Sequence, residues 1–152
     1  MLRNIAHVGI TVSNLERSIK FYRDVLGLQY KGQMVMEGEA TDKLFGKKNC
    51  TAKVAYLNGC KEILAPPVEL IEFTSEETEK AICKINSTGI SEVCFYVKDM
   101  DYVYDYLKES QVEFLSEPQF FDFSKDGFGK SKAVYFKDPD GIILELIEDM
   151  NE

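Results

Sequence analysis

Two short stretches of the chain, "VELIE" and "LELIE", each place a glutamate between large aliphatic residues. Side chains alternate between the two faces of an extended strand, so Glu69 and Glu145 lie on the face opposite the neighbouring leucines. His7 and Glu92 occupy a corresponding face in two earlier strands. Imidazole and carboxylate groups transfer protons and bind divalent cations. These four residues are therefore the candidates for chemistry.

The four positions correspond to one another because the chain is internally repeated. His7 and Glu92 are 85 residues apart, and the helices that follow them keep the same offset. Glu69 and Glu145 are 76 residues apart, so the second copy is nine residues shorter in its middle. Repeats of this kind mark duplicated supersecondary units that bury a shared face. We expect pseudo-symmetry to bring one pair of candidates from each copy toward a common point.

One imidazole and three carboxylates in a single cluster predict a bound cation. Carboxylates that face one apolar-walled cleft repel one another, whereas a divalent ion neutralises their charge and keeps them ionised. We predict that His7, Glu69, Glu92 and Glu145 are the ligands of a divalent metal. Two other interpretations stay open. The histidine could be an ordinary hydrogen-bonded strand residue beside solvent-facing glutamates, or the cleft could be vestigial.

The elements that position these residues follow from hydrophobic periodicity. An alternating strand at 5–12 turns its apolar side toward a helix, which leaves His7 on the other side. Ser13 and Glu16 have the spacing of a capping box at the start of that helix, and Gly27 is placed to end it. Further strands are predicted at 28–36, 51–57 and 68–73, with a long polar loop at 37–50.

The second copy repeats this order. An alternating strand that carries Glu92 leads into an amphipathic helix with Met100 and Leu107. Glu72 and Glu148 are interpreted as the solvent-exposed members of the last strands. The segment "FSKDGFGKSKAVYF" is interpreted as a flexible loop over the mouth of the cleft, because it lacks the spacing of a phosphate loop. Strands are predicted at 112–115, 132–137 and 142–147.

We therefore predict an α+β fold made of two tandem βαβββ units. The units cover about 1–74 and 90–150 and are joined by a polar connector at 75–89, all within one domain. Each unit should form a curved mixed β-sheet that lines a cleft, with its helix on the outside. Because such sheets leave exposed edges that association can cover, we also expect a homodimer.

The composition limits the class of protein. A chain of 152 residues with 45% hydrophobic and 29% charged residues is typical of a soluble globular domain. The formal net charge of -8 disfavours binding to nucleic acid or to an anionic membrane. The apolar stretches are too short for a membrane span and no secretory segment follows the first residue, so we expect a cytoplasmic protein. The cysteines lack metal-type spacing and are expected to be free, buried thiols: Cys50, Cys60, Cys83 and Cys94.

Two segments carry a family resemblance. "HVGITVSNLERSIKFYRDVLGL" resembles the opening, and "VYFKDPDGIILELIE" the closing segment, of the vicinal oxygen chelate superfamily, also called the glyoxalase, bleomycin-resistance and extradiol-dioxygenase fold. The resemblance spans nearly the whole chain and implies that His7, Glu69, Glu92 and Glu145 stand at the family's ligand positions. The third position is commonly histidine, so Glu92 makes this donor set richer in oxygen. Such a set suits Zn, Ni, Co, Mn, Fe or Mg better than a soft metal.

The resemblance also implies a reaction. In a glyoxalase-like lyase (lactoylglutathione lyase-like), isomerase or epimerase, the metal polarises a carbonyl and stabilises an enediolate while a carboxylate moves a proton beside it. Glu145 would be the displaced ligand and general base, with Glu69 as its partner. Thr11 stands where a basic contact to glutathione is expected, which disfavours a glutathione adduct as the small-molecule substrate. The ligand set also departs from the two-histidine, one-carboxylate triad of iron oxygenases, which disfavours ring-cleaving dioxygenase activity.

A different class of protein stays open. Members of the family that resemble drug-resistance proteins sequester a small molecule, such as an antibiotic, without a metal. Their clefts are lined by aromatic side chains, and four phenylalanines near the end of the chain could supply such a lining: Phe120, Phe121, Phe123 and Phe128.

Overall fold

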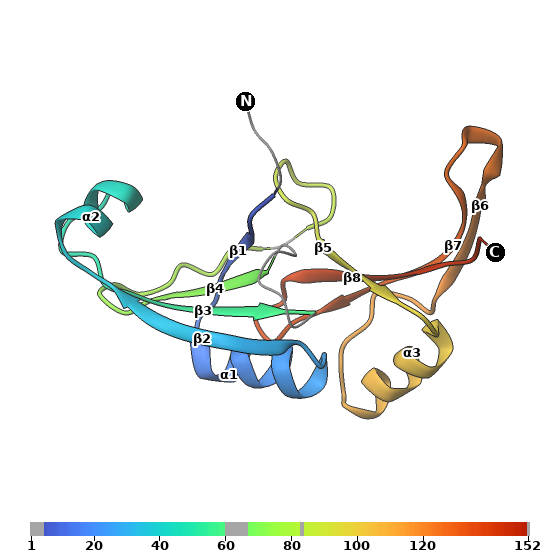
Figure 1. Ribbon diagram of the computed structural model, residues 1–152, viewed down its shortest axis with the longest axis horizontal. Helices are drawn as coiled ribbons and strands as arrows, with labels where there is room; N and C mark the ends of the chain where they lie inside the picture. The colour runs from blue at the N-terminus through green and yellow to red at the C-terminus, as the bar shows by residue number, and fades with distance from the viewer. Residues whose placement is uncertain (1–4, 60–66, 83, 152) are drawn as a thin grey trace. The chain divides into compact units, whose positions relative to one another are not determined.

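The computed structural model describes residues 5–59, 67–82 and 84–151, and the chain divides into two compact units, Met1–Ala81 and Ile82–Glu152 (Figure 1). The first unit contains β1 (Val8–Thr11), α1 (Leu15–Lys20), the π-helical turn η1 (Phe21–Val25), β2 (Gln29–Met36), α2 (Glu39–Phe45), β3 (Ala52–Asn58) and β4 (Val68–Phe73). The second contains β5 (Val93–Val97), α3 (Met100–Glu109), β6 (Gln119–Phe123), the 3-10 turn η2 (Ser124–Asp126), β7 (Gly129–Lys137) and β8 (Ile143–Asp149). The predicted α+β fold with two βαβββ-like units is confirmed, and most predicted strands are found within a few residues of their expected ends.

The first unit is built on a four-stranded mixed sheet in the order β1-β4-β3-β2. β1 runs parallel to β4, and the other neighbouring strands are antiparallel. α1 lies along one face of this sheet (Figure 1). The buried apolar side chains between helix and sheet are Ile10, Leu15, Ile19, Tyr22, Ala55, Leu57 and Leu70. Because side chains alternate, Glu69 lies on the opposite face of the sheet, which we call the open face.

The second unit repeats this arrangement with the strand order β5-β8-β7-β6. β5 is parallel to β8, and α3 covers the face on which the apolar side chains are buried. Those side chains are Met100, Leu107, Val134, Phe136, Leu144 and Leu146. Glu145 alternates with the last two and therefore lies on the open face of this sheet. In each unit the leucines of the last strand pack toward the helix, as the sequence predicts.

The prediction that Glu72 and Glu148 point into solvent is wrong. Glu72 is half-buried, and its Oε2 accepts a 3.0 Å hydrogen bond from the backbone N–H of Leu15, the first residue of α1. Glu148 accepts a 3.2 Å hydrogen bond from the N–H of Met100, the first residue of α3. The N–H groups of a first helical turn have no partner inside the helix, and a carboxylate there also meets the positive end of the helix dipole. The last strand of each unit thus caps its own helix.

The predicted capping box at the start of α1 is wrong by one residue. Asn14 is the N-cap, and its side chain accepts the N–H of Arg17 at 2.8 Å. Asp99 has the same role in α3, where it accepts the N–H of Tyr102 at 3.0 Å. The predicted end of the first helical segment is confirmed, because Gly27 has a φ of 76°, a left-handed conformation that favours glycine.

The strand predicted at 112–115 is wrong. In that stretch Phe114 makes an isolated bridge to Phe136, and the edge strand of the sheet is β6, whose five residues are all exposed. β6 and β7 form an antiparallel hairpin, and Gly127 in its turn has a φ of 83°. The segment predicted as a flexible loop over the cleft is this hairpin.

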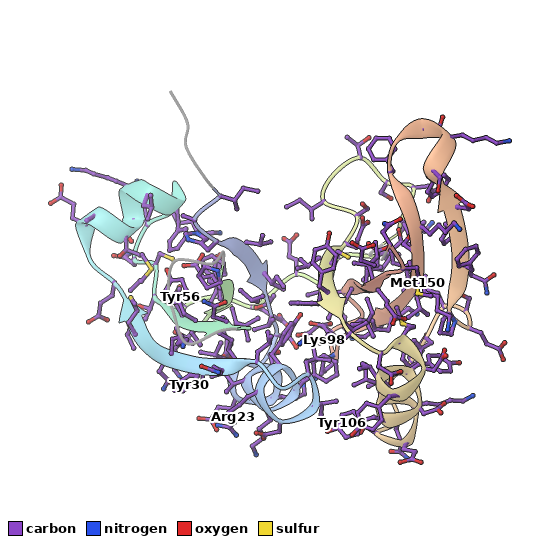
Figure 2. All side chains as sticks on the ribbon, turned by 45° about the vertical axis from the view of Figure 1, so that its right-hand side comes forward. Arg23, Tyr30, Tyr56, Lys98, Tyr106 and Met150 are labelled. Carbon is purple, nitrogen blue, oxygen red and sulfur yellow. The ribbon has the colours of Figure 1, made fainter. Side chains whose placement is uncertain are left out.

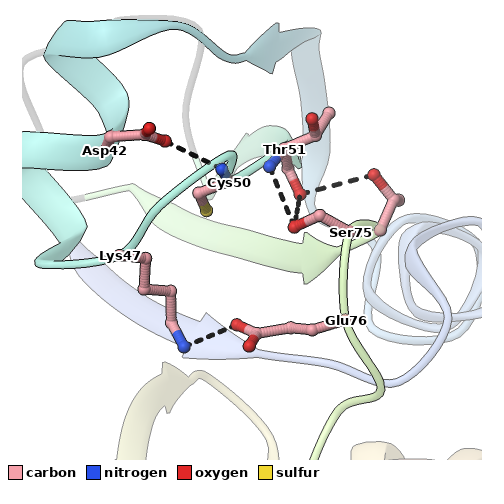
Figure 3. A network of polar contacts seen from close by, with 7 residues as sticks. Asp42, Lys47, Cys50, Thr51, Ser75 and Glu76 are labelled. Atoms are coloured by element: carbon pink, nitrogen blue, oxygen red, sulfur yellow. Dashed lines mark hydrogen bonds and ion pairs between the residues drawn. The ribbon is translucent and has the colours of Figure 1, made fainter.

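The polar loop predicted at 37–50 contains the helix α2. Figure 3 shows two contacts that hold this region in place. The Asp42 carboxylate accepts the backbone N–H of Cys50 at 2.8 Å, and Lys47 forms an ion pair of 2.5 Å with Glu76, which follows β4. The first contact closes the insertion between β2 and β3 on itself, and the second joins it to the segment that follows β4.

The predictions about membrane spans and about cysteines concern residues that the structure describes in part. None of their helices is long and apolar enough to cross a membrane. Cys50 is a buried free thiol as predicted, whereas Cys94 is free but exposed, so the prediction of a buried residue is wrong there. Cys60 and Cys83 lie outside the described residues.

Candidate functional site

Three polar side chains are in contact on the open face of the first unit. The Nε2 atom of His7 lies 3.2 Å from Oε2 of Glu69. The hydroxyl of Tyr56, which Figure 2 labels, donates a 2.6 Å hydrogen bond to Oε1 of Glu69. The rings of His7 and Tyr56 meet edge to face, with their centroids 6.0 Å apart. Each oxygen of the Glu69 carboxylate therefore has a partner.

Strand pairing produces these contacts. Glu69 on β4 is in register with Gly9 of β1 and with Tyr56 of β3, so its side chain lies between those two strands. Glu69 is only 9% exposed, whereas the side chain of His7 is 44% exposed. A Cβ atom at Gly9 would come within 3.3 Å of Oε2 of Glu69. Glycine at this position leaves the carboxylate enough room to reach His7.

The contact with Glu69 changes the acidity of the tyrosine. The hydrogen bond to Glu69 and, after it, burial and the carboxylate charge raise the pKa of Tyr56 to about 12. Below that pH the phenol keeps its proton, so it remains a hydrogen-bond donor to Glu69 throughout the physiological range. On the open face of the first unit, the Glu69 carboxylate is therefore oriented by the Tyr56 hydroxyl, which stays protonated at physiological pH.

The second unit builds a related arrangement around Glu145. Glu145 on β8 is in register with Cys94 of β5 and with Tyr135 of β7. Partial burial of the thiol, followed by the hydrogen bond to Glu145 and the charges of Glu145 and Glu92, raises the pKa of Cys94 to about 12, although the residue as a whole is exposed. Burial and the charges of Glu145 and Glu92 also raise the pKa of Tyr135. Glu145 and Glu92 therefore act electrostatically on the same two groups.

Tyr56 and Tyr135 were not among the residues predicted from the sequence. Each lies on the third strand of its unit, directly across from the glutamate of the last strand. A signal was present, since "VAYLNG" and "AVYFKDPDG" both place a tyrosine before an apolar residue and a turn. Strand register, which the periodicity of a single strand does not give, was needed to connect each tyrosine with its glutamate.

The predicted ligands are distributed evenly between the two units. His7 and Glu69 lie in the first and are in contact, and Glu92 and Glu145 lie in the second. Within the described parts of the chain, no three His, Cys, Asp or Glu side chains gather closely enough to hold a metal ion.

The pair in the first unit has a geometry that fits a cation. Ligand atoms roughly 2.0–2.2 Å from a metal, with an angle of about 90–109° between the bonds, lie roughly 2.8–3.6 Å apart. The 3.2 Å between Nε2 of His7 and Oε2 of Glu69 falls within that interval. An imidazole nitrogen and a carboxylate oxygen are also donors that Zn, Mn, Fe, Co and Ni accept. The separation of these two donor atoms is therefore compatible with adjacent ligands of one ion.

The phenylalanines predicted to line a cleft do not share one face. In the register of β6 with β7, Phe121 and Phe123 lie on the same face as Tyr135, and Phe120 lies on the other. The rings of Phe121 and Phe123 are stacked, with centroids 5.6 Å apart and planes at 11°. Two of the four predicted residues thus form an exposed aromatic pair on the open face of the second sheet.

Comparison with known proteins agrees with the class of fold. The sequence model of the Glyoxalase/Bleomycin resistance protein/Dioxygenase superfamily matches residues 4–146. The match covers most of the chain, which therefore belongs to this superfamily, as the resemblance implied.

Individual relatives include enzymes. The chain is 27% identical to 2-epi-5-epi-valiolone epimerase of an Actinomyces species over 94% of its own length and 78% of the relative's. It is 30% identical to metallothiol transferase FosB of Staphylococcus epidermidis, with 96% and 84% of the two chains covered. Among solved structures, a glyoxalase family protein from Bacillus cereus superposes with a TM-score of 0.82 at 23% identity, over 99% of this chain and 97% of that one. The last similarity establishes the fold.

Proposed function

We propose that this protein is a divalent-metal-dependent isomerase, epimerase or lyase that moves a proton beside the carbonyl group of a small oxygenated substrate. The observation that carries the proposal is the pairing of His7 with Glu69 at 3.2 Å on the open face. Glu92 and Glu145 are the corresponding pair of the second repeat. We propose that Glu92 and Glu145, like His7 and Glu69, are ligands of a divalent cation.

Two further points support this proposal. The relatives include a protein named as an epimerase and one named as a metallothiol transferase. An epimerase inverts a stereocentre, and removing a proton next to a carbonyl is a chemically accessible way to do so.

In this proposal the cation supplies Lewis-acid polarisation of the substrate carbonyl. Glu145 is the general base, which takes the proton from the carbon next to that carbonyl and returns it to the same carbon or to its neighbour. Glu69 is its partner in the first repeat. Tyr56 holds one oxygen of Glu69, so the other is left to face the ligand set. His7 and Glu92 complete that set.

Proton exchange with solvent tests the reaction without knowledge of the natural product. We would incubate the purified, metal-loaded protein in D₂O with hydroxyketones, hemithioacetals and 2-oxo thioesters and follow the α-protons by NMR. The proposal expects deuterium incorporation that is lost on replacing Glu145 with glutamine. The exposed Glu16→Ala variant in the first turn of α1 is the matched control and should retain exchange. Failure of every substrate with every metal would remove the enzymatic proposal.

A second candidate function is binding of a small aromatic molecule without catalysis, as in drug-sequestering members of the family. The stacked pair Phe121 and Phe123 favours this candidate, since exposed aromatic rings on an open face can stack with a ligand. Fluorescence titration of the metal-free protein with aromatic ligands separates the two. Binding that is lost in Phe121→Ala and retained in Phe120→Ala, together with no isotope exchange, would favour the binding protein.

A further inference from the structure

The carboxylate of Glu69 has two oxygens in different environments. Oε1 accepts the 2.6 Å hydrogen bond from the hydroxyl of Tyr56, and Oε2 lies 3.2 Å from Nε2 of His7. A hydrogen bond of this length to an ionised acceptor belongs to the strong class. Rotation of the carboxylate would break that bond, so the oxygen that faces His7 is fixed by the tyrosine on the other side.

The surroundings of Glu69 reinforce this orientation. Glu69 is 9% exposed, and little water reaches it to replace a lost partner. Gly9 stands directly beside it in the strand register, where any side chain would press on Oε2. Gly9 offers no donor from a side chain, so among the described residues the hydrogen bond from Tyr56 holds the Glu69 carboxylate in the orientation that His7 meets.

We propose that Tyr56 is a positioning residue for Glu69: its hydroxyl occupies Oε1 and thereby presents Oε2, together with Nε2 of His7, to a cation. The cation part rests on the proposed function, whereas the orientation of Glu69 is a property of the metal-free protein. Groups that orient a metal ligand in this way typically contribute 10–100-fold to metal affinity. Tyr56 acts through Glu69 and does not itself meet the substrate.

The test compares Tyr56→Phe with wild type in two states. In the metal-free protein, His7 is the single histidine of the chain, so its ring nitrogens give one unambiguous set of ¹⁵N NMR signals. Loss of the Tyr56 hydroxyl frees Glu69 to rotate, and the Nε2 signal of His7 should shift. In the metal-loaded protein, Co²⁺ affinity measured by chelator competition should fall about 10–100-fold, and the visible Co²⁺ spectrum should change.

Tyr30→Phe is the matched control, because it removes a hydroxyl from a 39% exposed tyrosine of the same sheet. It should leave the His7 signals unchanged and Co²⁺ affinity within twofold of wild type. If Tyr56→Phe behaves like Tyr30→Phe in both states, the positioning role is overturned. If wild type binds no metal but Tyr56→Phe still shifts the His7 signals, the orientation of Glu69 stands and the proposed metal function fails.

A measurement on the wild type covers the case in which Tyr56→Phe does not fold. The hydroxyl proton of a phenol in a 2.6 Å hydrogen bond exchanges slowly with water, so a downfield signal with a nuclear Overhauser effect to the Glu69 side chain is expected. Its absence at low temperature would overturn the proposal.

Discussion

Replacing Glu72 should destabilise the protein through the start of α1. Its Oε2 accepts the N–H of Leu15 at 3.0 Å, and Leu15 itself is buried with 1% exposure. A hydrogen bond to a charged group contributes about 1.5–3 kcal/mol, and a carboxylate near a helix N-terminus adds about 0.3–1 kcal/mol. Because Glu72 is half-buried, the lower part of the summed range applies. We expect Glu72→Ala to lower the free energy of unfolding by about 2 kcal/mol.

Glu72→Gln separates the two contributions, because glutamine keeps an acceptor oxygen and loses the charge. Its cost should be about 1 kcal/mol. Urea unfolding at neutral pH, followed by far-ultraviolet circular dichroism, measures both variants. Glu16→Ala, an exposed acidic residue in the same helical turn, is the control and should cost less than about 0.5 kcal/mol. If Glu72→Ala unfolds within about 0.5 kcal/mol of Glu16→Ala, the capping role is refuted.

Three further substitutions or conditions have defined outcomes. Ser18→Ala should raise the free energy of unfolding by about 1–2 kcal/mol in the same urea assay, because the Ser18 hydroxyl is fully buried without a hydrogen-bond partner and alanine favours the helix. For Tyr56, a pKa of about 12 in the fold against 10.0 ordinarily gives stability that is largely present below pH 10 and is lost as pH rises toward 12, so wild type should lose about 1–2 kcal/mol more than Tyr56→Phe over that interval. Asp42→Ala removes the acceptor of two 2.8 Å hydrogen bonds, from the N–H groups of Asn49 and Cys50. Limited proteolysis should then cut within 39–50 at least several-fold faster than in Lys43→Ala, and equal rates would contradict the anchoring role.

The repeat predicted much of the fold because both copies obey the same periodicities. The alternation of strands and the spacing of apolar helical residues correctly assigned the faces of Glu69 and Glu145. The two extra glutamates, Glu72 and Glu148, were misinterpreted because alternation gives only the face of a side chain. Whether that side chain meets solvent or a helix N-terminus depends on where the helix begins in space.

Two elements were missed for different physical reasons. α2 has little apolar periodicity, and contacts outside the helix support it, including the edge-to-face contact of Phe45 with Phe73 at 5.3 Å. β6 was missed because the stretch around Phe114 and the stretch 119–123 both favour strands. Pairing with β7 distinguishes the two stretches: residues 119–123 pair with it along their whole length, whereas Phe114 makes one isolated bridge, to Phe136.

The sequence predicted which residue types form the candidate site, but it did not predict which of their side chains are in contact. The repeat identified His7 and Glu69, and it could have identified Tyr56, which has an equivalent in Tyr135. The 2.6 Å hydrogen bond of Tyr56 arises from the register of β3 against β4, which local sequence does not specify. The orientation of Glu69 therefore depends on how the strands pair, whereas its carboxylate could be identified from the sequence.

Metal content of the purified protein decides whether the paired residues serve a cation. Elemental analysis after growth with supplemented divalent metals and exhaustive dialysis should find about one ion per chain in wild type and in Glu16→Ala. His7→Ala and Glu145→Ala should each retain less than about a tenth of that amount while remaining folded by circular dichroism. A folded wild type that holds no divalent metal under these conditions, or variants that hold as much as wild type, would contradict the proposed site.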